Sequence, residues 1–237
     1  IQTFTRNFSR AFHDFDEYLK ERLISGMEKV PLNKEKAVLS DEIFDRLSDI
    51  PFVDRYEAYQ ILDDKWQSIS GDLEMIQTEG FSAVKQVDPN MVMKKKDGKE
   101  QEVQEGWRGH ILPFDLIEET LLKSEKEAIS RKEDRLLEIS GEIESIFESL
   151  SEEDKDREAV NEAGDAFVTA ALKKECKQVK ADIKNGESFE EDSYESKILS
   201  VETLMGEEAS LKKEIKAETA ALHLKTKETI EELGDAQ

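Results

Sequence analysis

Apolar and polar residues alternate with a helical period over the first third of the chain. Six apolar residues lie three or four positions apart and define one helix face: Phe4, Phe8, Phe12, Phe15, Leu19 and Leu23. Gly26 and Pro31 end this first helix. Ser40 is the expected N-cap of a second helix, because acidic residues fill positions 41 and 42. A third helix is expected over residues 53–68, so residues 1–72 form a helical region.

The pattern changes over residues 73–113, where short apolar runs predict strands. The sequence Met-Ile-Gln at 75–77 and the sequence Met-Val-Met at 91–93 are both expected strands. The Asp97-Gly98 pair suits a two-residue type I′ turn, so residues 100–103 are the expected return strand. Pro113 ends this small β-hairpin element.

Long helices are predicted over residues 114–237. Leucine or isoleucine recurs every seven residues from Leu122 to Leu150, and Ile139 and Ile146 add a second row, as in a coiled-coil seam. A polar break over 151–164 precedes a second apolar stripe, which Asn185-Gly186 ends, and a last helix follows. Breaks of this kind let helices fold back as antiparallel hairpins. The predicted fold is therefore mainly α, with a small β-hairpin element followed by long antiparallel coiled-coil-like helices.

The net charge of the chain argues against some classes of function. The 237 residues include 56 acidic and 34 basic side chains, so the formal net charge is 34 − 56 = −22. Such a surface argues against nonspecific binding to DNA or to anionic membranes, because both select basic surfaces. No run approaches the roughly 18 apolar residues of a membrane span. The single cysteine, Cys176, cannot form an internal disulfide, which fits a reducing cytosol, so we expect a cytoplasmic protein.

The sequence lacks the motifs that nucleotide, cofactor and hydrolytic chemistry use. It contains no G-x-G-x-x-G, no P-loop and no G-x-S-x-G elbow. Three histidines lie far apart and belong to no zinc motif: His13, His110 and His223. Cys176 lies at helical spacing with Leu172 and Val179, as expected for a buried thiol. The acidic residues at 154, 156 and 158 lack the glycine and terminal glutamate of a calcium loop, so a solvated charge run is expected.

One basic cluster and four aromatic residues are of a kind that contacts nucleic acid. The cluster comprises the lysines at the expected hairpin tip: Lys94, Lys95, Lys96 and Lys99. As phosphate contacts they would be independent of base sequence, and the alternative is a solvated turn that blunts a strand edge. The aromatic residues are Tyr56, Tyr59, Trp66 and Trp107. Helical spacing favours core packing over base stacking for the first three.

Two segments resemble a known family. Residues 52–66, Phe-Val-Asp-Arg-Tyr-Glu-Ala-Tyr-Gln-Ile-Leu-Asp-Asp-Lys-Trp, are similar to the modification (DNA methyltransferase) subunit of type I restriction–modification enzymes, in the part that follows its catalytic domain. The second segment runs from Gly106-Trp107-Arg108 through Ile111-Leu112-Pro113 to Leu116-Ile117, where the family's C-terminal helices begin. The resemblance covers roughly residues 5–120. Beyond them only the architecture of long charged helices is similar.

The resemblance implies a parent enzyme that methylates the N6 atom of adenine in DNA with S-adenosylmethionine. The family's Asn/Asp-Pro-Pro-Tyr/Phe motif and its glycine-rich cofactor motif do not occur in this sequence. No catalytic, cofactor-binding or metal-binding residue is therefore assigned, and this segment by itself is expected to be non-catalytic. The absence of an initiator Met fits a C-terminal piece of a longer polypeptide.

The resemblance also implies partners. In the family, the C-terminal helices pack against helical spacers of the specificity subunit, restriction subunits join the complex, and DNA is bound by the whole assembly. Residues from about Phe114 onward would then form the docking region. Its candidate docking residues are apolar seam positions, which a partner helix completes: Leu122, Ile129, Leu136, Ile143, Leu150, Leu204, Leu211, Ile215 and Leu222.

The sequence is also compatible with self-association and with two other functions. The same stripes would let the isolated piece self-associate, because the pattern does not identify which helix covers it. An unrelated coiled-coil scaffold or adaptor is the main alternative function. A small enzyme whose site the sequence does not reveal is a third.

Overall fold

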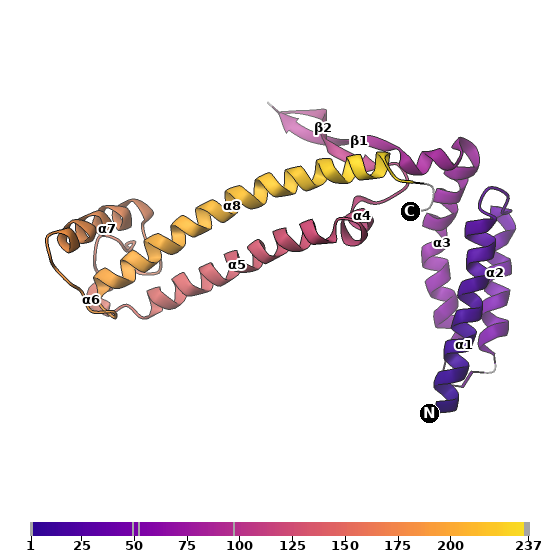
Figure 1. Ribbon diagram of the computed structural model, residues 1–237, viewed down its shortest axis with the longest axis horizontal. Coiled ribbons are helices and arrows are strands. Elements are labelled where there is room, and N and C mark those ends of the chain that lie inside the picture. Colours follow the sequence, from indigo (N-terminus) through magenta and orange to yellow (C-terminus); the bar gives the residue numbers. More distant parts are fainter. Residues whose placement is uncertain (1, 49, 52, 97, 235–237) are drawn as a thin grey trace. The chain divides into compact units, whose positions relative to one another are not determined.

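A computed structural model describes residues 2–48, 50–51, 53–96 and 98–234 of the protein (Figure 1). These residues are mainly helical, with one small antiparallel sheet, as predicted. The elements in chain order are α1 (Gln2–Leu19), a π-helical turn η1 (Lys20–Ser25), α2 (Leu32–Leu47), α3 (Arg55–Glu79), a 3-10 turn η2 (Phe81–Lys85), β1 (Val87–Lys96), β2 (Lys99–Gly109), α4 (Phe114–Thr120), α5 (Lys123–Glu148), α6 (Glu152–Lys155), α7 (Thr169–Lys184) and α8 (Tyr194–Glu231).

The chain divides into two compact units. One comprises residues 1–117 and 227–237, and the other comprises residues 118–226. The end of α8, from Lys227, therefore belongs to the first unit. Across the residues that the structure describes, no helix combines the length and apolar character that crossing a membrane requires.

Helices α1, α2 and α3 lie in the first unit. Helix α2 packs against both α1 and α3. Its buried Ile43 and Leu47 meet the phenylalanine stripe of α1, which confirms the predicted helix face. The expected start of α2 at Ser40 is wrong, because the helix begins at Leu32, directly after Pro31. The Ser40 hydroxyl lies within the helix and donates a hydrogen bond of 2.6 Å to the Lys36 carbonyl instead of capping an end.

Helix α3 is longer than its expected range. The Asp54 carboxylate caps its start by accepting a 2.8 Å hydrogen bond from the Tyr56 backbone N–H. The helix then continues to Glu79, so the strand expected at residues 75–77 is wrong. Leu73 and Ile76 are buried on the same helical repeat as Trp66, which is why the segment remains helical.

The predicted β-hairpin is confirmed, and its strands are longer than expected. β1 and β2 pair antiparallel from Val87 opposite Gly109 to Lys96 opposite Lys99, with a bulge between Pro89 and Met91. Gly98 has a φ of +76°, which a tight turn requires and glycine adopts without strain. Asp97, the other predicted turn residue, lies outside the described residues.

The second unit is built on α5 and the major part of α8. Lys197 of α8 donates to the Ser149 carbonyl just after α5, whereas Lys132 of α5 meets Glu214 further along α8. Residue numbers therefore rise along one helix as they fall along the other, so the two helices run antiparallel (Figure 1). Coiled-coil packing between them stays a prediction.

The segment between α5 and α8 packs around one core together with the end of α5 and the start of α8. α7 contributes Leu172, Cys176 and Val179, and α8 contributes Ile198 and Val201. The polar break contains the single-turn helix α6, and an antiparallel bridge pairs its Val160 with Phe167, which follows the break. α7 ends where the sequence predicts, because Gly186 has a φ of +100° and its N–H donates to the Ile183 carbonyl at 3.1 Å.

Candidate interaction surfaces

The lysine cluster lies on the hairpin among carboxylates of the opposite strand. Lys94 Nζ donates to Glu105 Oε1 at 2.8 Å, and Lys95 is paired across the sheet with Glu100. Lys95 and Lys99 are exposed, and the Lys96 side chain lies outside the described residues. The acidic neighbours weaken the local positive field that a phosphate would meet. A phosphate contact at this tip stays a prediction.

The candidate aromatic residues have different surroundings. Trp66 is buried in the first unit. The Tyr59 ring stacks on Phe44 at 5.9 Å between centroids, and Tyr56 meets the same ring edge-on at 5.1 Å. Lys227 lies 4.9 Å from the Trp107 ring centroid. The core role that helical spacing favours is therefore confirmed for the buried Trp66 and fits the half-buried Tyr59, whereas it is wrong for Tyr56, which is 64% exposed.

The candidate docking residues lie on α5, on α8 or next to the ends of α5. Five of these nine residues are buried: Leu122, Ile129, Leu150, Leu204 and Leu222. The other four are half-buried: Leu136, Ile143, Leu211 and Ile215. Much of this apolar surface is thus covered within the chain itself. A role in docking a partner stays a prediction, and the half-buried positions are the ones a partner would reach.

Ion pairs join α5 to α8. Arg135 donates two hydrogen bonds to the Glu207 carboxylate, at 2.8 and 3.1 Å, and a third to Glu142 at 2.6 Å. Lys132 bridges Glu214 and Glu218. The Lys225 ammonium and the Ser124 hydroxyl lower the pKa of Glu125 to about 2 by hydrogen bonding to its carboxylate. These pairs link the two helices and balance the charge of these glutamates locally.

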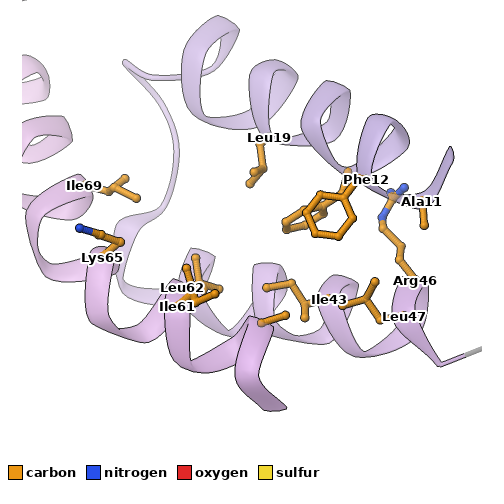
Figure 2. Close-up of a pocket in the computed structure, with 12 residues that line it drawn as sticks. Ala11, Phe12, Leu19, Ile43, Arg46, Leu47, Ile61, Leu62, Lys65 and Ile69 are labelled. Atoms are coloured by element: carbon orange, nitrogen blue, oxygen red, sulfur yellow. The ribbon is translucent and has the colours of Figure 1, made fainter. Parts of the chain in front are cut away.

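An open apolar groove lies in the first unit between α1 on one side and α2 with α3 on the other (Figure 2). Its volume is about 270 Å³. Ten lining residues are apolar and two are cations: Ala11, Phe12, Phe15, Leu19, Ile43, Leu47, Ala58, Ile61, Leu62 and Ile69, with Arg46 and Lys65. Phe12 and Ile61 remain 49% and 61% exposed, so this apolar surface is incompletely covered within the unit.

The sequence does not single out this groove as a site. Ala58, Ile61, Leu62 and Ile69 are spaced three, one and seven residues apart and share one face of α3. This spacing indicates an apolar face of the helix. A fully packed helix face has the same spacing, so the sequence does not distinguish an open groove from a packed interface.

The remaining candidate residues belong to separate local structures. The Cys176 thiol is buried and donates to the Ile198 carbonyl at 3.3 Å, and burial raises its pKa to about 11. Asp154 caps α6 with Ser151, whereas Glu158 pairs with Lys174. The acidic residues of this segment therefore have different partners. Among the described residues, no group of three histidine, cysteine or acidic side chains is arranged to hold a metal ion.

His110 has a position that its isolation in the sequence does not reveal. Its Nδ1 lies 2.8 Å from Asp88 Oδ2, and its buried Nε2 lies 3.3 Å from Glu79 Oε2, without the alignment of a hydrogen bond. The hydrogen bond to Asp88 raises the pKa of His110, and the nearby Glu79 carboxylate adds to this shift. The imidazole thus links the end of α3 to the base of the hairpin.

Comparisons with known proteins give no match. No protein-family model, curated protein or solved structure is significantly similar to this chain.

Proposed function

We propose that this chain is the non-catalytic C-terminal region of the modification subunit of a type I restriction–modification enzyme, and that it assembles the subunit with its specificity subunit. The observation that carries the proposal is the pair of family-like segments at residues 52–66 and 106–117. Their order resembles that in the part of the subunit that follows the methyltransferase domain. In this proposal, S-adenosylmethionine binds the methyltransferase domain of the parent subunit, and that domain methylates adenine in DNA.

The geometry supports a role in assembly through the long α5–α8 pair. Cross-helix ion pairs at Arg135 and Lys132 hold the two helices in one register. A pair fixed in this way presents its outer and half-buried positions to a partner with little loss of conformational entropy on binding. The specificity subunit is the partner in this proposal. The restriction subunit joins the assembled complex, and DNA is reached through that complex.

Deletion of residues 114–237 from the parent subunit tests the proposal. The expected result is loss of copurification with the specificity subunit, while the remaining methyltransferase domain still binds S-adenosylmethionine in calorimetry. That retained binding controls for misfolding of the truncated subunit. Normal assembly after the deletion would refute the docking role.

An unrelated scaffold or adaptor is the alternative, and the long paired helices α5 and α8 are the observation that favours it. The coding sequence that precedes Ile1 separates the two functions. A methyltransferase domain with an Asn-Pro-Pro-Tyr/Phe-type motif supports the modification subunit. A start codon with no methyltransferase supports the adaptor.

A further inference from the structure

His110 joins three segments of the first unit at the base of the hairpin. Its Nδ1 lies 2.8 Å from a carboxylate oxygen of Asp88 in β1, and its Nε2 lies 3.3 Å from a carboxylate oxygen of Glu79, the last residue of α3. Its backbone N–H donates to the carbonyl of Gln86, between η2 and β1, at 2.9 Å. The ring therefore lies where the chain passes from helix to hairpin.

The two ring nitrogens of His110 have different surroundings. Nδ1 forms a hydrogen bond with Asp88, whereas Nε2 is buried and has no hydrogen-bond partner within the part of the chain that the structure describes. The group beside Nε2 is the Glu79 carboxylate, which in its ionised form only accepts hydrogen bonds. The proton on Nε2 therefore decides whether this contact is favourable.

Protonation of the ring changes the contact with Glu79 from repulsive to attractive. In the imidazolium both nitrogens carry a hydrogen, so one N–H donates to Asp88 and the other faces Glu79. In the neutral ring the hydrogen bond to Asp88 retains the proton on Nδ1, and Nε2 then directs a lone pair at a carboxylate. Because two acceptors repel each other, the contact between the ring and the end of α3 is lost.

The charges around His110 favour the protonated form. Glu79 approaches the ring from α3, and Asp88 approaches it from β1. The neighbouring cations are Lys85, at the end of η2, and Arg108, which lies opposite Asp88 in the sheet. The carboxylates outweigh these cations, because the pKa of His110 is raised overall, chiefly by the hydrogen bond to Asp88.

We propose that His110 is a proton-controlled clasp, which holds the end of α3 against the base of the hairpin when it is protonated and releases it when it is neutral. Release loosens residues 80–86, the short connection between α3 and β1, and leaves the strand pairing of the hairpin intact. The inference rests on His110 and its two carboxylates alone and is independent of the proposed function.

Hydrogen exchange of the full chain tests the clasp at backbone amides of this connection. Gly80 donates to Ile76, Ala83 donates to Gly80, and Gln86 donates to Ala83. After correction for the intrinsic effect of pH on exchange, these amides are expected to exchange about threefold faster or more at about pH 8.5 than at about pH 5.5. Amides of α2 serve as the reference for global unfolding. Equal protection of the connection at both pH values, or an equal loss of protection in α2, would overturn the proposal.

Glu79→Gln separates the clasp from other effects of pH. The glutamine amide donates to the neutral Nε2 and its carbonyl accepts from the protonated one, so the junction stays closed at both pH values. The pH dependence of exchange at residues 80–86 is therefore expected to disappear. Glu74→Gln is the matched control, because it removes another exposed carboxylate near the same end of α3. This control is expected to retain the pH dependence. Retention of the pH dependence in Glu79→Gln, or its loss in Glu74→Gln, would show that Glu79 is not the group that the clasp holds.

Discussion

Glu35 is a fully buried acidic side chain of α2, and its partner comes from a different element. Arg22 of η1 donates to both carboxylate oxygens of Glu35, through Nε and, at 2.7 Å, through Nη2. The two residues are thirteen positions apart, so neither helical spacing nor charge pattern indicates their pairing. This bidentate contact satisfies a carboxylate that would otherwise be buried without compensation.

Arg22→Met is expected to destabilise the protein by about 2–3 kcal/mol, because Glu35 is left buried and unpaired. This value lies below the usual cost of breaking a buried pair, since Arg22 itself remains 35% exposed. The double variant Arg22→Met/Glu35→Leu is expected to recover most of the loss, because it leaves no buried charge. Urea unfolding measures both. A double variant that is less stable than the single one would contradict this account.

His110 gives the protein a pH-dependent contribution to stability. Its pKa is raised in the folded state, chiefly by the hydrogen bond to Asp88. The stabilisation is therefore complete below the unfolded pKa of about 6.5 and is lost as the pH rises through the higher folded pKa. His110→Gln should lower the free energy of unfolding more at about pH 5.5 than at about pH 9.

Urea unfolding at the two pH values checks this prediction. His13→Gln, which changes an exposed histidine of α1, is the matched control. An effect of His110→Gln that is equal at both pH values, or larger at the higher one, would show that the Asp88 contact does not stabilise the imidazolium.

At the scale of elements, the sequence predicted helices best where a stripe was long and its ends were marked. The phenylalanine stripe of α1, the Asn185-Gly186 end of α7 and the course of α8 are confirmed. The strand expected at residues 75–77 is wrong, because two adjacent apolar residues, Met75 and Ile76, fit a strand and a helix equally well. Burial of Ile76 against other elements decided the outcome, and tertiary contacts of that kind are not visible in a local window.

Alanine substitutions at three glycines test how helix interiors and a helix end contribute to the stability of the second unit. Gly141 in α5 and Gly206 in α8 lie within helices, and a Cβ added at either meets no atom within 4 Å. Alanine at each is expected to stabilise the unit by about 0.5–1 kcal/mol, because alanine loses less backbone entropy on folding. Gly186→Ala is expected to destabilise it by about 1–2 kcal/mol, since a φ of +100° strains any side chain.

Chemical denaturation of the three variants measures these changes. The interior substitutions serve as controls for the loss of a glycine as such. Destabilisation by Gly141→Ala and Gly206→Ala of the same size as that by Gly186→Ala would contradict the role given to the α7 end.

At the scale of the whole molecule, the net charge of −22 coexists with locally paired surfaces. Lysines and arginines of α5 meet glutamates of α8, and the hairpin lysines face glutamates of the other strand. Sequence alone indicated the apolar seam but not what covers it, because a heptad stripe is the same whether its partner lies in the same chain or another. Much of the seam is buried within the chain, whereas the groove between α1 and α2–α3, which the sequence does not single out, is an open apolar surface.

The most direct test of the proposed assembly role is native mass spectrometry of this 237-residue chain mixed with the specificity subunit of the same system. The account predicts a stable complex without any methyltransferase domain. It also predicts that the chain lacking residues 114–237 forms no complex. Two free species in the first mixture, or an intact complex in the second, would contradict it.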